Sequence, residues 1–214
     1  MLKDQEKQLV DLTVADFAEE TAGESMAPGG GSISAYVGAL GVSLGTMVAN
    51  LSAHKAGWDD KWEYYSEWAS KGQAYKNRLL YLVDEDTNSF NKIIDGFRMP
   101  KSNAEEVALR KEAIEEATKY ATEIPFQVME TACDSMEVMQ EMVHHGLQTS
   151  LSDAGVGALC ARTAVIGAYF NVRINAKDIK DKAFAEDILK RAKAVYERAI
   201  QTEQEIVSYI DTKI

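Results

Sequence analysis

Apolar residues recur at intervals of three and four along most of the chain, and no stretch alternates convincingly with a period of two. The clearest apolar stripe runs through Trp62, Tyr65, Ala69, Tyr75, Leu79, Leu82, Phe90, Ile93 and Phe97. This spacing places the side chains on one face of an α-helix from about residue 60 to 97. Similar patterns predict helices from about 102 to 145 and from 178 to 211, the first kinked or split at Pro125. We therefore predict an all-α fold, a bundle of long antiparallel helices forming one domain over residues 1–214.

Two further helices are predicted to be unusually rich in small residues. The first follows Pro28-Gly29-Gly30-Gly31-Ser32, and the second follows Ser152-Asp153. Ser32 or Ser34 is expected to cap the first helix, and Ser152 or Asp153 the second. Small side chains let helix backbones approach closely, so we expect these two helices to pack together and their N-termini to frame one pocket.

The segment from Ser25 to Ala53 contains no charged residue and is long enough to span a bilayer. Its many glycines and hydroxyl side chains, and the lack of an aromatic and basic girdle, argue against a membrane span. We predict a central buried helix instead.

The glycine loop at 29–31 is a candidate binding element. Without Cβ atoms, it allows a ligand to reach successive backbone N–H groups. The N-terminus of the following helix favours an anion or a polar ring edge. A plain tight turn is the simpler interpretation, and no Gly-Lys-Ser/Thr follows to make a phosphate loop.

Asp86 falls on the apolar stripe between Leu82 and Phe90. A buried carboxylate is costly unless it is paired, and burial raises its pKa toward the range useful for proton transfer. Asp86 is therefore a candidate catalytic group, with a structural ion pair as the alternative. Its neighbours Asp84 and Glu85 are expected to be solvated.

Composition narrows the function classes. A net charge of −11 argues against a nucleic-acid partner. Cys133 and Cys160 lack CxxC spacing and are expected to be buried and reduced, and no cluster at ligand spacing predicts a metal site. The N-terminus lacks a secretory pattern, so we expect a cytoplasmic protein with no membrane partner.

Taken together, several stretches resemble the formiminotetrahydrofolate cyclodeaminase family, which includes methenyltetrahydrofolate cyclohydrolases. The matching residues are Pro28-Gly29-Gly30-Gly31-Ser32, Asp86 and Phe90, Met99-Pro100-Lys101, Ser152-Asp153 with Val156, and Gly167 to Asn175. The resemblance covers essentially the whole chain in order. It departs where the family often has Gly-Asn and this chain has Gly146-Leu147, which puts any contact of that asparagine in doubt.

The resemblance implies a dimer of helical subunits that converts 5-formiminotetrahydrofolate to 5,10-methenyltetrahydrofolate with loss of ammonia. It implies no metal and no cofactor beyond the folate substrate, and a separate glutamate formiminotransferase to deliver it. Asp86 and Asp153 are the expected catalytic carboxylates, their acid and base roles unassigned. The expected folate-binding residues are Gly29, Gly30, Gly31 and Ser32 through backbone N–H groups, Asn171 and Asn175 at the pterin, and Lys101, Arg162 and Arg173 at the glutamate carboxylates. Hydrolysis of methenyltetrahydrofolate is the nearest alternative, and a non-catalytic folate-binding or helical interaction protein is the second.

Overall fold

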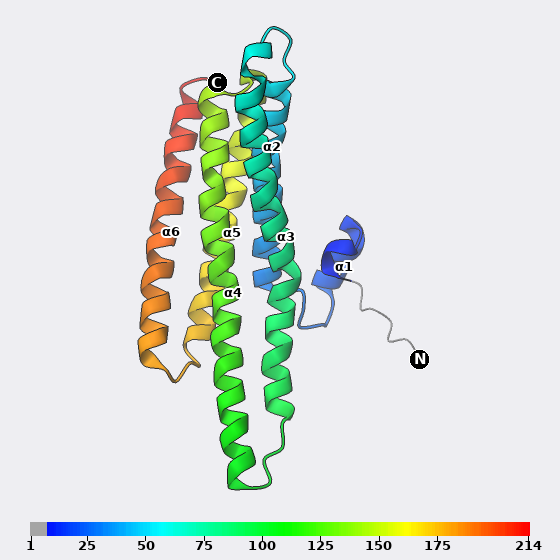
Figure 1. Ribbon diagram of the computed structural model, residues 1–214, viewed down its shortest axis with the longest axis vertical. Helices are drawn as coiled ribbons and strands as arrows, with labels where there is room; N and C mark the ends of the chain where they lie inside the picture. The colour runs from blue at the N-terminus through cyan, green and yellow to red at the C-terminus, as the bar shows by residue number, and fades with distance from the viewer. Residues whose placement is uncertain (1–7) are drawn as a thin grey trace.

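The computed structural model describes residues 8–214, which form six α-helices and no strand (Figure 1). The helices are α1 (Val14–Ala22), α2 (Gly30–Ala53), α3 (Trp62–Arg98), α4 (Ala104–His145), α5 (Leu151–Ala176) and α6 (Lys182–Asp211). Short 3-10 turns at Leu9–Asp11, Asp59–Lys61 and Gln148–Ser150 precede α1, α3 and α5. The predicted all-α bundle is confirmed.

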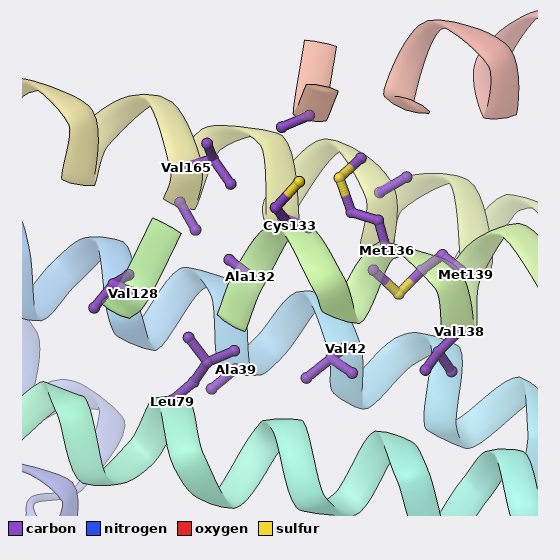
Figure 2. Packing of buried hydrophobic residues seen from close by; sticks show 14 of the residues in the cluster. Ala39, Val42, Leu79, Val128, Ala132, Cys133, Met136, Val138, Met139 and Val165 are labelled. Carbon is purple, nitrogen blue, oxygen red and sulfur yellow. The ribbon is translucent and has the colours of Figure 1, made fainter. Parts of the chain in front are cut away.

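Helices α2, α3, α4 and α5 form the core, and α6 packs along α4 and α5. Figure 2 shows Ala39 and Val42 of α2 facing Leu79 of α3, with residues of α4 between them and α5. The methionines of α4 fill this core, as the sequence pattern indicates: Met129, Met136, Met139 and Met142 are all essentially inaccessible to solvent.

The small residues bring α2 and α5 into close, antiparallel contact. A Cβ added at Gly41 would lie 2.7 Å from the carbonyl oxygen of Gly157, and one added at Gly38 would lie 3.1 Å from Ala164 Cβ. The close packing is confirmed. Because the helices run in opposite directions, their N-termini lie at opposite ends of the bundle, so the expectation that they frame one pocket within the chain is wrong.

Helix α2 and the segment Gln148–Ala176 are long and apolar enough to cross a membrane by length and composition alone. However, 61% of the most apolar 18-residue stretch of α2 is buried inside the bundle, as in the core helix of a soluble protein. The prediction of a central buried helix fits this structure.

Three helix ends differ from the sequence prediction. Helix α4 begins at Ala104, two residues later than expected, with Asn103 Oδ1 accepting from the Glu106 N–H at 2.9 Å. Pro125 lies within α4 without splitting it. Ser32, Ser34, Ser152 and Asp153 lie inside their helices rather than at the cap positions, which Gly29 and Ser150 occupy.

Candidate active site

Asp86 of α3 takes the capping role that a serine was expected to fill at the start of α2. Its Oδ2 accepts from the Ser32 backbone N–H at 2.8 Å and from the Ser32 hydroxyl at 3.1 Å. The first N–H groups of a helix have no partner within the helix and carry partial positive charge. A carboxylate from a neighbouring helix satisfies one of them, the Ser32 N–H, so the anion at the start of α2 is a side chain of the same chain.

The space for this contact depends on Gly31. A Cβ at that position would lie 2.1 Å from Asp86 Oδ1 and 2.6 Å from Oδ2. No side chain fits there without displacing the carboxylate. The glycine at position 31 is thus explained by the close approach of Asp86.

Burial raises the pKa of the Asp86 carboxyl, and the two hydrogen bonds from Ser32 offset this only in part. None of the described residues donates a hydrogen bond to Oδ1 or forms an ion pair with Asp86. One carboxylate oxygen is therefore fixed, and the carboxyl group lies at the wall of a cavity. The alternative that Asp86 serves in a structural ion pair is not supported among residues 8–214, where no cation pairs with it.

A cavity of about 230 Å³ opens beside Asp86 at the start of α2. It is lined by Met26, Ala27, Gly29, Gly30, Gly31, Asp86, Thr87, Ser89, Phe90, Ile93, Ala121, Asn171 and Asn175. Asp86 is the only charged residue among them. The structure thus brings the glycine loop, Asp86 and both predicted asparagines together, with Ser32 directly behind the carboxylate.

Both asparagines are held by backbone carbonyl groups. Asn175 Nδ2 donates to the Ala121 carbonyl at 2.7 Å, and Asn171 Nδ2 donates to the Gly167 carbonyl at 3.0 Å. Within α4, the Ala121 carbonyl would normally accept from the residue at 125, but Pro125 has no N–H. Asn175 fills the vacancy, which fixes its amide and leaves its oxygen as an acceptor at the cavity wall.

The other predicted site residues do not line this cavity. Asp153 is in the first turn of α5, about 27 Å along the helix from Asn171. Arg162 pairs instead with the buried Glu203 of α6, at 3.6 Å from Nε. Lys101 lies in the exposed connection between α3 and α4, and Arg173 is exposed beside the ring of Tyr169.

Much of the cavity wall was not predicted from the sequence, and the surroundings of two acidic residues were predicted wrongly. The cavity is also lined by Met26, Thr87, Ser89, Ile93 and Ala121. Of these, only Ile93 lies on the apolar stripe that predicted inward side chains. Glu85 is buried rather than solvated and accepts a hydrogen bond from Tyr120. Asp84 accepts from the Leu9 N–H at 2.6 Å. Contacts from outside α3 bury Glu85 and partly bury Asp84, and the helical pattern of α3 does not show such contacts.

Within residues 8–214, no group of three or more histidine, cysteine, aspartate or glutamate side chains is placed to hold a metal ion. The groups that the described residues place at the cavity are one carboxyl of raised pKa, the side-chain amides of Asn171 and Asn175, the hydroxyl-bearing residues Thr87 and Ser89, and the backbone of the glycine loop.

Comparison with known proteins identifies relatives that match nearly the whole chain. The mouse formimidoyltransferase-cyclodeaminase is 34% identical over 194 residues, which is 91% of this chain but 36% of the mouse protein. The chain thus spans about a third of that relative. The methenyltetrahydrofolate cyclohydrolase of Methylorubrum extorquens is 29% identical over 94% of this chain and 97% of its own length.

A solved structure has the same fold. The crystal structure of formiminotetrahydrofolate cyclodeaminase from Thermotoga maritima superposes with a TM-score of 0.84, covering 96% of this chain and 98% of that one at 22% identity. The family model described as formiminotransferase-cyclodeaminase matches residues 13–194, and the chain belongs to that family.

Proposed function

We propose that this protein converts 5-formiminotetrahydrofolate to 5,10-methenyltetrahydrofolate and ammonia. The observation that carries the proposal is one cavity that combines a carboxyl of raised pKa, a glycine loop open to ligand contact and two fixed asparagines. The relatives named for cyclodeaminase and cyclohydrolase support a folate substrate.

The reaction needs proton transfer between two nitrogens that are held close together. N10 attacks the formimino carbon and forms a C–N bond, and the C–N bond to the departing nitrogen then breaks. N10 loses one proton, and the departing nitrogen gains protons to leave as ammonia, with one proton taken up overall. Asp86 can accept the N10 proton and pass it to the leaving nitrogen, because a raised pKa lets the carboxyl both take up a proton and give it back. As a carboxylate, it also stabilises the cation that develops.

The remaining wall of the cavity is suited to a flat, polar ring. Phe90 offers an aromatic surface, and Asn175 offers an acceptor whose orientation is set by Ala121. The backbone of the glycine loop, which has no side chains to block a ligand, forms the remaining polar part of the cavity wall. Holding the ring in this way orients N10 and the formimino carbon for attack, which is itself a large part of such catalysis.

Hydrolysis of 5,10-methenyltetrahydrofolate to the 10-formyl form is the second candidate. The observation in its favour is that the Methylorubrum extorquens cyclohydrolase matches this chain over nearly its full length. The same cavity would serve, with Asp86 taking a proton from the water that attacks the cation. The mouse relative carries the formimidoyltransferase name as well, so we infer that a glutamate formiminotransferase supplies the substrate of a cyclodeaminase of this kind.

Absorbance of the methenyl product, measured with ammonia release, tests the proposal. Freshly generated 5-formiminotetrahydrofolate and 5,10-methenyltetrahydrofolate are offered separately to the wild-type protein, to Asp86→Asn and to Asp84→Asn. We expect methenyl formation with equal ammonia release, lost in Asp86→Asn and retained in Asp84→Asn, whose side chain contacts Leu9 instead of the cavity. Turnover of the methenyl compound alone would establish the second candidate. No turnover of either compound by folded wild-type protein would refute both.

A further inference from the structure

A groove of about 470 Å³ lies between the second half of α2 and the facing part of α3, and the proposed reaction does not use it. Its lining includes Asn50 and Lys76, and it is here called the Lys76 groove. Asn50 lies near the end of α2, whose 24 residues extend over about 36 Å from the Asp86 end. The groove is therefore separate from the Asp86 cavity of the same chain. Its volume falls within the range of about 300–1,000 Å³ that is usual for small-molecule sites.

Close packing of α2 against α3 forms the floor of the groove. A Cβ added at Gly72 of α3 would lie 2.1 Å from Thr46 Oγ1 of α2, and Thr46 is buried among the lining residues. Met47 and Leu51, which are 37% and 45% exposed, provide an apolar wall. The groove thus has a rigid floor and an apolar side that is open to solvent.

Lys76 provides the charge of the groove. Its side chain is half-buried, and the lining contributed by residues 8–214 contains no aspartate or glutamate. Each of the other cations of α3 contacts a partner side chain; these are Lys71, Arg78, Lys92 and Arg98. A half-buried ammonium without an ion pair has lost part of its hydration, which an anion in the groove would replace. In a chain with a net charge of −11, a small anion is repelled least where no acidic side chain lies.

The polar groups around Lys76 divide into those that are already used and those that are available. The hydroxyls of Ser43 and Thr46 donate to carbonyl groups of α2 at 2.6 and 2.7 Å. His54 Nδ1 donates to the Asn50 carbonyl at 2.8 Å, which fixes the imidazole at the end of α2. Within the described part of the chain, the side-chain amides of Asn50 and Gln73 have no hydrogen-bond partner. Two amide donors therefore accompany the unpaired ammonium.

We propose that the Lys76 groove is a second ligand site, which binds a carboxylate carried on an apolar body. Lys76 pairs with the carboxylate, the amides of Asn50 and Gln73 donate to it, and Met47 and Leu51 pack against the body. A single cation favours one carboxylate over a phosphate, which carries nearly two charges at neutral pH and has no apolar part. Two sources have this chemistry: a free organic acid, and the benzoylglutamate end of a folate. The groove itself does not rest on the proposed function.

Binding of 4-fluorobenzoate, followed by ¹⁹F NMR, tests the site without reference to turnover. The wild-type protein should bind it with a millimolar dissociation constant. Lys76→Gln should weaken binding about 10- to 100-fold, the range for losing a hydrogen bond to a charged group. Lys71→Gln is the matched control on the same helix and should bind like wild type, because Lys71 pairs with Glu137 at 2.8 Å and does not line the groove. Leu51→Gln, which keeps the charge and removes part of the apolar wall, should weaken binding severalfold.

Three results would overturn the proposal: no binding by the wild type, equal binding by Lys76→Gln and Lys71→Gln, or binding of the neutral 4-fluorobenzamide as tight as that of the carboxylate. Displacement of 4-fluorobenzoate by an equal concentration of inorganic phosphate would also overturn it, because the groove would then select charge alone. If Lys76→Gln does not fold, unchanged binding by Leu51→Gln would be the contradicting result.

Competition distinguishes the two sources of the carboxylate. Displacement of 4-fluorobenzoate by 4-aminobenzoylglutamate at much lower concentration than by benzoate would support the proposal with a folate as the source. Equal or better displacement by benzoate would support it with a free organic acid. A wild-type protein that turns over neither folate but binds 4-fluorobenzoate through Lys76 would refute the proposed function and leave this site established.

Discussion

Asp86 is stabilised in place by interactions that differ from those that make it chemically useful. The start of α2 and the Ser32 hydroxyl hold one carboxylate oxygen. Burial raises the pKa of the same group. A residue arranged in this way is expected to reduce the stability of the fold while serving the reaction, and that conflict can be measured.

Replacing Asp86 by asparagine should lower turnover and raise stability near neutral pH. The asparagine keeps an acceptor for Ser32 but cannot exchange a proton, so turnover should fall on the order of 10²–10⁴-fold. The folded pKa of Asp86 lies above the unfolded value, so the cost of its charge is fully present above the folded pKa and is relieved as pH falls through it. The gain in unfolding free energy should therefore be largest near neutral pH and shrink toward about pH 4.

Urea unfolding of both proteins across this pH range provides the measurement. An Asp86→Asn protein that is less stable than wild type at neutral pH would show that the Ser32 hydrogen bonds outweigh the cost of burial.

Gly31→Ala should disrupt the site through its added Cβ, which would lie 2.1 Å from Asp86 Oδ1. The carboxylate would have to leave the start of α2, and turnover should fall by about 10²-fold, the scale expected when a catalytic group is misplaced by 1 Å. Gly29→Ala is the control variant in the same loop, because its added Cβ would meet nothing closer than the Met26 carbonyl oxygen at 3.7 Å. Steady-state kinetics of the two variants should differ clearly, and equal losses would mean that the loop backbone rather than Asp86 controls the rate.

At the scale of the helices, sequence periodicity predicted most of the fold but less of the site. The stripe through Tyr65 and Leu82 predicted α3 to within two residues at each end. The glycines predicted the close contact of α2 with α5, but their spacing does not show whether the two helices run parallel or antiparallel. The capping of α2 by Asp86 could not be predicted, because it depends on how α3 packs against the start of α2 and not on either sequence alone.

Pro125 and Asn175 are expected to be energetically coupled. Asn175→Ala would leave the Ala121 carbonyl without its donor, at a cost of about 1–3 kcal/mol. In a Pro125→Ala background, the restored N–H at 125 can serve that carbonyl, so the same change should cost little. Urea unfolding of the double-mutant cycle measures the coupling.

Asn171→Ala is the matched control for this cycle, because its carbonyl partner, Gly167, lies one helical turn away in the same helix. Its cost should be smaller and independent of residue 125. Equal costs for Asn175→Ala in both backgrounds would mean that Pro125 does not determine the position of Asn175.

At the scale of the whole molecule, binding of a folate at the Asp86 cavity should stabilise the fold, because a ligand that binds only the folded chain raises the free energy of unfolding. The stable analogue 5-formyltetrahydrofolate, with oxygen in place of the formimino nitrogen, should therefore raise the wild-type melting temperature. At 100 times its dissociation constant it should contribute about 2.7 kcal/mol. Gly31→Ala, whose added Cβ displaces the Asp86 carboxylate, should lose most of this shift. Leu109→Glu, at an exposed position of α4 that does not line the cavity, should keep it. A Gly31→Ala protein with the full shift would show that the folate does not bind at this cavity.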